Sequence, residues 1–301
     1  MDDFMKKCKR IWINRIFILK RSFKWTGIVM SIIGFVGLFV PMTDFLSFIQ
    51  NGILRIIAGT GVVLGIWIAL LICSCVCFAR QRRISVIDLQ NKHHVYVQYG
   101  DVFSEDEVLN PSERRNIVID FNRCFDTKVN DDLVSSATLH GKAVKKILKA
   151  KNISSEALNL ELQKDLNERQ HVTSVDLSEA EKRDGNLKRY PAGTVAEYKL
   201  NDKEVFFFLG LSKFDYGLTA KTDSDEYGEA VMRLIEYIKN RSQGLSVVMP
   251  ILGTGLAKTE NDERDTLEYM IKALKLYRRR LNCDIHIVVW EGKDPISITD
   301  L

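Results

Sequence analysis

Two long stretches near the N-terminus, residues 25–43 and residues 56–79, carry no charged side chain. Each is long enough to cross the hydrocarbon core of a bilayer, which takes about 20 helical residues. The connector between them, residues 41–52, is short and holds no Lys or Arg. We therefore expect a transmembrane helical hairpin over residues 25–79, preceded by a basic juxtamembrane segment over residues 1–24.

Beyond residue 83 the spacing of apolar positions alternates between the period of strands and the period of helices. Such alternation indicates an α/β layered fold. The polar stretch 171–191 is expected to be a surface excursion. Strands are predicted over residues 84–88, 93–99, 116–121, 194–200, 204–211, 246–249 and 284–290, and helices over residues 137–149, 154–168, 224–240 and 262–280.

Charge divides the chain in the same way as hydropathy. Residues 1–83 hold 12 Lys and Arg against 3 Asp and Glu, whereas residues 84–301 hold 31 against 36. Basic residues flank both apolar stretches on the sides away from the connector, so the positive-inside rule places both termini in the cytoplasm, at the inner (plasma) membrane. The soluble part is mildly acidic, which argues against a nucleic-acid partner.

The six cysteines form no CxxC pair, and three of them lie in the second apolar stretch. This spacing predicts neither a disulfide framework nor a zinc site in a cytoplasmic domain. We therefore expect no metal and no resident cofactor.

An apolar run ends in Gly253-Thr254-Gly255, shortly before a predicted helix. Backbone N–H groups in such a small-residue turn are suited to binding a phosphate, with help from the helix dipole. Lys258, four residues after Thr254, is placed to neutralise phosphate charge. The alternative is a tight turn without a ligand, with Lys258 as an ordinary solvated lysine.

Four segments in sequence order resemble those of macro domains. They are Tyr99–Phe103, Ile117–Asn122, Tyr190–Val195 and Val248–Gly255. The resemblance implies a three-layer α/β domain over residues 84–301, with a mixed sheet between helices, that binds an ADP-ribose-type nucleotide. It implies adenine recognition by Asp101 and ribose contact by Asn122, although Asp101 is also suited to capping a turn and Asn122 to holding its own loop. The ligand-binding residues expected on this basis are Asp101, Val102, Asn122, His140, Gly253, Thr254, Gly255, Leu256 and Lys258.

The chain departs from catalytic macro domains at two places. Residues 131–140 stand where those domains carry a Gly-rich loop, and Leu256 stands where they carry an aromatic residue. Both departures favour a binding protein over an enzyme. The alternatives are a membrane-anchored ADP-ribosyl hydrolase, with Asn122 orienting a water molecule, and a scaffold with a degenerate pocket. For His140, ligand contact and a structural role are both open.

Two apolar spans followed by a macro-like domain resemble the membrane-anchored macro-domain effectors of Thoeris anti-phage defence. This resemblance implies a nucleotide second messenger, histidine-linked ADP-ribose, made by a TIR-domain partner. It further implies a homo-oligomer whose hairpins disrupt the lipid bilayer after the signal binds.

Overall fold

The computed structural model describes residues 2–37, 49, 51–254, 262–291 and 296–299. Contacts divide the chain into two compact units, residues 1–82 with 297–301, and residues 83–296. Three of the expected ligand-binding residues, Gly255, Leu256 and Lys258, lie outside the described residues.

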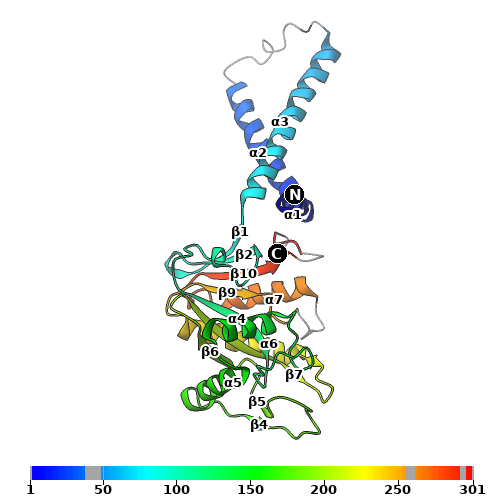
Figure 1. Ribbon diagram of the computed structural model, residues 1–301. Coiled ribbons are helices and arrows are strands. Elements are labelled where there is room, and N and C mark those ends of the chain that lie inside the picture. The colour runs from blue at the N-terminus through cyan, green and yellow to red at the C-terminus, as the bar shows by residue number, and fades with distance from the viewer. Residues whose placement is uncertain (1, 38–48, 50, 255–261, 292–295, 300–301) are drawn as a thin grey trace. The chain divides into compact units, whose positions relative to one another are not determined.

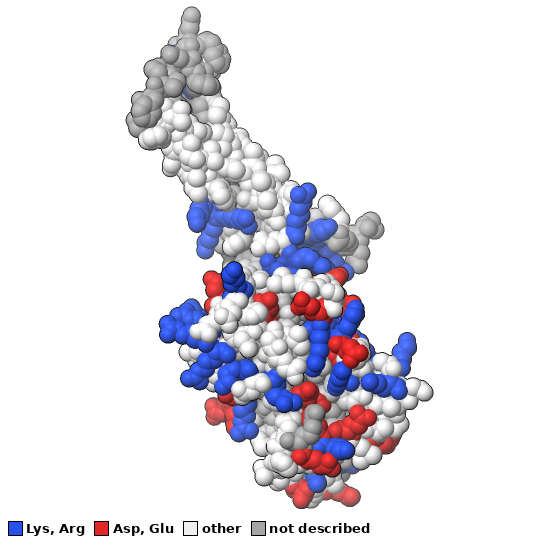
Figure 2. Space-filling view, turned by 90° about the vertical axis from the view of Figure 1, so that its left-hand side faces the viewer, with Lys and Arg blue, Asp and Glu red and all other residues white. Residues whose placement is uncertain are grey.

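The first unit contains three helices, α1 (Asp2–Ile13), α2 (Arg15–Gly37) and α3 (Gly52–Arg80). Among the described residues only α3 is long and apolar enough to cross a membrane. The structure therefore does not support the expected multi-pass arrangement, because α2 begins with charged residues and the rest of the first expected span, residues 38–43, lies outside the described part. On the visible face of these helices the surface is uncharged along most of its length, and Lys and Arg side chains gather at one end (Figure 2).

A buried amide joins the two ends of the chain within this unit. Asn14, at the junction of α1 and α2, is 1% exposed and donates to the carbonyl of Arg10. Its Oδ1 accepts hydrogen bonds from the Ser297 hydroxyl at 2.9 Å, the Ile298 N–H at 3.2 Å and the Thr299 hydroxyl at 2.9 Å. Pairing of this kind is what a buried polar side chain requires.

The second unit is built on one mixed sheet, in which seven strands follow the order β1-β2-β10-β9-β3-β7-β6 (Figure 1). Strands β2, β10, β9, β3 and β7 run parallel, and β1 and β6 pair antiparallel at the two edges. This confirms the expected mixed sheet. The strands are β1 (Arg83–Asp88), β2 (His94–Gly100), β3 (Arg115–Asn122), β6 (Val195–Lys199), β7 (Glu204–Phe214), β9 (Val247–Pro250) and β10 (Ile285–Trp290).

Helices cover both faces of the sheet, which gives the expected three layers. Helices α4 (Leu139–Lys151) and α5 (Ser155–Lys164) pack in one apolar cluster with Phe206 and Phe208 of β7. Phe207 points to the other face, because side chains alternate along a strand, and it meets Tyr237 of α6 (Ser224–Arg241). Helix α7 (Glu263–Leu276) contacts α6 on that side.

Most of the stretch 171–191 lies at the surface, as its polar composition predicts, and its buried residues are Leu177, Lys182 and Tyr190. It contains a small hairpin of β4 (Val175–Asp176) and β5 (Lys188–Arg189). Lys182 is fully buried and Tyr190 is 0% exposed. Lys182 is the exception that composition did not predict, because its burial depends on a partner from elsewhere in the chain, Asp126. Another two-residue strand, β8 (Ala220–Lys221), pairs with the end of β7.

Candidate functional site

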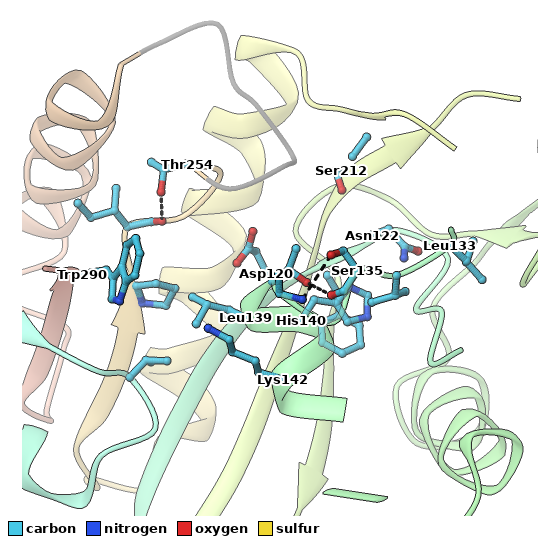
Figure 3. A pocket seen from close by; sticks show the side chains of 18 of the residues that line it. Asp120, Asn122, Leu133, Ser135, Leu139, His140, Lys142, Ser212, Thr254 and Trp290 are labelled. Atoms are coloured by element: carbon cyan, nitrogen blue, oxygen red, sulfur yellow. Dashed lines mark hydrogen bonds between the residues drawn. The ribbon is translucent and has the colours of Figure 1, made fainter. Parts of the chain in front are cut away.

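A pocket of about 730 Å³ lies at the carboxyl ends of the parallel strands (Figure 3). Its lining comes from the residues that end or follow β2, β3, β7, β9 and β10. Strands β9 and β3 are neighbours in the sheet. The strands that follow β3 in this sheet, β6 and β7, lie on one side of this pair, whereas β10, which follows β9, lies on the other side. The pocket therefore opens at the point where the strand connections diverge, which is the usual ligand site of open α/β sheets.

At one end of the pocket the turn after β2 presents Asp101 and Val102. The Asp101 Oδ1 accepts the N–H of Phe103 at 3.0 Å, which fixes the carboxylate and leaves its second oxygen for a ligand. The N–H of Val102 has no acceptor among the described residues. An acceptor and a donor on neighbouring residues complement the amino group and the adjacent ring nitrogen of adenine.

Trp290, which the sequence did not suggest as a site residue, lies beside this turn. It ends β10 and pairs in register with Gly100, the residue before Asp101. Its side chain is 72% exposed and lines the pocket. An exposed indole next to hydrogen-bonding groups provides a surface on which a base can stack. Its place at the end of a predicted strand was the available signal, but the adjacency of β10 and β2 is not visible in the sequence.

Asn122 ends β3 at the centre of the pocket and is 3% exposed. Its Oδ1 accepts the N–H of Cys124 at 3.0 Å and that of Asp126 at 3.5 Å, so the side chain does hold its own loop. Its Nδ2 has no partner among the described residues although it is buried. An unpaired buried donor is costly, and this one belongs to a residue that lines the pocket.

His140, in the first turn of α4, also lines the pocket. Its ring stacks on Phe121 with centroids 3.5 Å apart, and its Nε2 lies 2.8 Å from the carbonyl oxygen of Asp126. Because a carbonyl only accepts, Nε2 carries the proton and Nδ1 is an acceptor. Burial lowers the pKa of His140 to about 4, so the ring is neutral at physiological pH. The structural role and a place at the ligand site therefore coexist.

The turn after β9 forms the side of the pocket between Trp290 and Asn122. Gly253 has a φ of 74°, which a glycine adopts without strain. Thr254 lines the pocket and its hydroxyl donates to the carbonyl of Ile251 at 3.0 Å, whereas Gly253 is not among the lining residues. The structure thus brings Asp101, Val102, Asn122, His140 and Thr254 to one cavity.

Two carboxyl groups that the sequence analysis missed face the same cavity. Asp120 of β3 and Glu263 at the start of α7 both line it. Burial raises the pKa of each, and for Glu263 the neighbouring Asp262 adds to the effect. Lys142 is the one Lys or Arg among the described lining residues. Because side chains alternate along a strand, Asp120 lies on the same face of β3 as Asn122, and this could have identified Asp120 from the sequence. Within the described chain, no group of three or more His, Cys, Asp or Glu side chains is arranged to hold a metal ion.

The far wall consists of residues 131–138 and the β7–β8 hairpin. The Asp131 carboxylate accepts the N–H of Ser136 at 2.6 Å, and Asp132 pairs with Arg183 at 2.7 Å. Leu133 packs in an apolar cluster with Val134 and Leu218. This loop is therefore held by its own polar contacts and by apolar packing, and it closes the pocket beyond Asn122.

Comparison with known proteins places these features in a family context. Residues 95–290 match the model of the macro domain of Thoeris protein ThsA. Over 255 residues, which are 82% of this chain and 76% of the relative, the sequence is 28% identical to Thoeris protein ThsA of Bacillus amyloliquefaciens (strain Y2).

Among solved structures, an Oceanobacillus iheyensis macrodomain mutant, G37V, with ADPR is similar at a TM-score of 0.44 and 12% identity, covering 70% of this chain and 91% of that one. The macrodomain of Mycobacterium tuberculosis DarG is similar at a TM-score of 0.37 and 14% identity, covering 64% and 96%.

Proposed function

Because the chain belongs to the ThsA macro-domain family of Thoeris anti-phage defence, we propose that its pocket is the receptor for an ADP-ribose-type nucleotide signal. One observation carries the proposal. A single cavity brings an adenine-complementary turn, a glycine turn and a buried unpaired amide to the carboxyl edge of the sheet. Its volume lies within the range of small-ligand sites.

The order of these features along the pocket suits the order of groups in ADP-ribose. We place adenine between Trp290 and the Asp101–Val102 turn, and the diphosphate at the turn that contains Thr254. The distal ribose then lies near Asn122 and His140. Backbone N–H groups of a small-residue turn before a helix are suited to the diphosphate.

The far wall leaves space for a group attached to the distal ribose. Residues 131–138 and Leu218 line the pocket beyond Asn122. We propose that this group is an amino acid, histidine in the form implied by the family resemblance, and that a TIR-domain enzyme makes the conjugate. A titration with ADP-ribose and with its histidine conjugate tests this, and equal affinity for the two compounds contradicts a role for the distal group.

We propose a sensor rather than a hydrolase. The carboxylates of the loop at the distal end are already engaged, Asp131 with the N–H of Ser136 and Asp132 with Arg183. Hydrogen bonds from Ser136 lower the pKa of Asp131, which makes this carboxylate a weaker base for activating water. Incubation with an ADP-ribosylated substrate should return it intact by chromatography, and product formation that disappears in Asn122→Ala would support the enzyme instead.

Calorimetric titration with ADP-ribose tests the pocket itself. Asp101→Asn keeps an acceptor for Phe103 but turns a donor toward the adenine amino group, so we expect a loss of affinity of about 10-fold or more. Asp202→Asn is the matched control, because Asp202 is 97% exposed and lies in the β6–β7 turn, at the other edge of the sheet. Binding that is unchanged in Asp101→Asn would contradict the assignment.

For the response we propose that α3 anchors a homo-oligomer in the lipid bilayer. Ligand binding then changes the packing of the protomers and permeabilises the bilayer. A ligand drives such a change only by the difference in its affinity for the two states. Dye release from liposomes that contain the full chain should rise when the nucleotide is added. Confirmed binding without leakage or a change in oligomer size rules this response out.

A further inference from the structure

The turn that carries Asp101 is held from below by a buried carboxylate, that of Glu107. Glu107 is 5% exposed and lies in the short 3-10 turn Glu105–Glu107. Its Oε1 accepts the backbone N–H of Asp101 at 3.2 Å. A Cβ on Gly100 would collide with this carboxylate, so the glycine is what allows the close approach.

The second oxygen of the Glu107 carboxylate is also engaged. Its Oε2 accepts a hydrogen bond from Nε2 of Gln98, a residue of β2 that is 1% exposed. The same Nε2 donates to the Glu107 carbonyl at 2.8 Å. The carboxylate is therefore fixed at both oxygens and cannot rotate away from the turn without breaking two bonds.

Gln98 is oriented in turn by His286 of β10. Because the Gln98 amide nitrogen donates to Glu107, its Oε1 must be the atom that His286 Nδ1 approaches at 3.0 Å, and Nδ1 carries the proton. His286 is 0% exposed and stacks on Tyr96 with centroids 5.0 Å apart. Three side chains from β2, β10 and the 3-10 turn thus form one buried polar network under the turn.

Arg115 holds the other side of the same turn. It is 2% exposed, and its guanidinium donates to the carbonyls of Ser104 and of Phe103, the latter at 2.9 Å. Glu204 pairs with it at 2.6 Å. Residues 101–104 are therefore clamped between Glu107, which holds an N–H, and Arg115, which holds carbonyls.

We propose that Glu107 is a positioning residue that gives the pocket its preference for adenine over hypoxanthine, an inference that rests on the proposed function. Recognition depends on the direction of two groups, the free Asp101 oxygen as acceptor and the Val102 N–H as donor. Hypoxanthine presents the reverse pattern, an acceptor at position 6 and a donor at position 1. A site built to hydrogen-bond one pattern rejects the other strongly only while its groups are held in place.

The test compares ADP-ribose with its hypoxanthine counterpart, inosine diphosphate ribose, by calorimetry on the full chain. Wild type should bind the adenine compound about 100-fold more tightly. Glu107→Gln keeps the side-chain volume but loses one acceptor. We expect the ratio of the two affinities, adenine compound over hypoxanthine compound, to fall by about 10-fold or more, mainly through weaker binding of the adenine compound. Glu105→Gln is the matched control, since Glu105 is exposed in the same 3-10 turn, and its ratio should equal that of wild type.

Gly100→Ala displaces the same carboxylate without altering it, and it should lower the ratio as Glu107→Gln does. This second variant keeps a readout if Glu107→Gln fails to fold. A merely structural role would weaken both compounds equally and leave the ratio unchanged, and that result overturns the inference. Wild type that binds both compounds alike also overturns it, while the proposed function stands. If wild type binds neither compound, both this inference and the proposed function are overturned.

Discussion

The ammonium group of Lys182 lies 2.7 Å from Oδ2 of Asp126, and both side chains are inaccessible to solvent, at 0% and 1% exposure. Lys182 also donates to the carbonyl of Asn186 at 2.8 Å, and Asp126 Oδ1 accepts the Asn186 N–H at 2.6 Å. The pair therefore ties the stretch 171–191 to the loop after β3. Since the Asp126 carbonyl faces His140, this contact also supports the wall of the pocket.

Lys182→Met should destabilise the macro-like unit strongly. Removal of one partner leaves the Asp126 carboxylate buried and uncompensated, which costs about 3–5 kcal/mol. Thermal unfolding of the full chain in detergent measures the effect. Lys128→Met is the control, because its partner Asp184 is at a similar 2.8 Å but Lys128 is exposed, and its midpoint should stay close to that of wild type. Equal midpoints for the two variants would contradict a structural role for the buried pair.

Asn122→Asp should separate the two roles of Asn122. Aspartate retains the oxygen that accepts from Cys124 and Asp126, so the loop keeps these two hydrogen bonds, although a carboxyl group at this buried position lowers the melting temperature. It lacks the Nδ2 donor, and we expect ADP-ribose affinity to fall by about 10-fold. Asn130→Asp is the control, since the Asn130 oxygen holds Leu133 in the same manner, at 2.8 Å, without lining the pocket. Full affinity in Asn122→Asp would leave the amide nitrogen without a role in binding.

Trp290 should report ligand binding directly. Stacking of a base on an aromatic ring contributes about 1–3 kcal/mol, so Trp290→Ala should weaken ADP-ribose binding about 10-fold or more. The other three tryptophans, Trp12, Trp25 and Trp67, all lie in the first unit. Intrinsic fluorescence should therefore change on titration of wild type and of Trp12→Phe, and the change should be much smaller in Trp290→Phe. A signal of undiminished size in Trp290→Phe would place adenine elsewhere.

Stability should decrease as the pH falls below about 6.5, partly through His286. Burial lowers the pKa of His286 to about 3 in the folded protein, against about 6.5 when unfolded. Between these values the unfolded chain binds one more proton, so stability rises with pH and is lost as pH falls, at about 1.4 kcal/mol per pH unit. His286→Gln should flatten the slope of unfolding free energy between pH 6 and 4.5 by about that amount. An equal slope in wild type and His286→Gln would contradict a neutral, buried His286 as a source of the pH dependence.

Much of the fold follows from local pattern. The predicted strand 116–121 is β3 (Arg115–Asn122), and the predicted helix 224–240 is α6 (Ser224–Arg241). The strand was predictable as a short apolar run, because β3 is buried on both faces, and the helix was predictable because one buried face imposes a period of 3.6. The predicted helix 262–280 was too long, since α7 ends at Leu276. Leu276 is followed by Tyr277 and three arginines, and such a pattern is compatible with the last turn of a helix and with a turn after it.

The sequence by itself determined most of the elements, the α/β class, the long apolar helix α3 and the short motifs at Asp101, Asn122 and Gly253, because each depends on residues within a few positions of one another. Only the tertiary structure decided which distant residues meet. Trp290 lies beside the turn that carries Asp101 because β10 pairs with β2, Lys182 became buried because Asp126 lies opposite, and Glu107 came under Asp101 because Gly100 leaves room for it. Such contacts depend on strand order and packing between segments far apart in the chain, which no local period encodes.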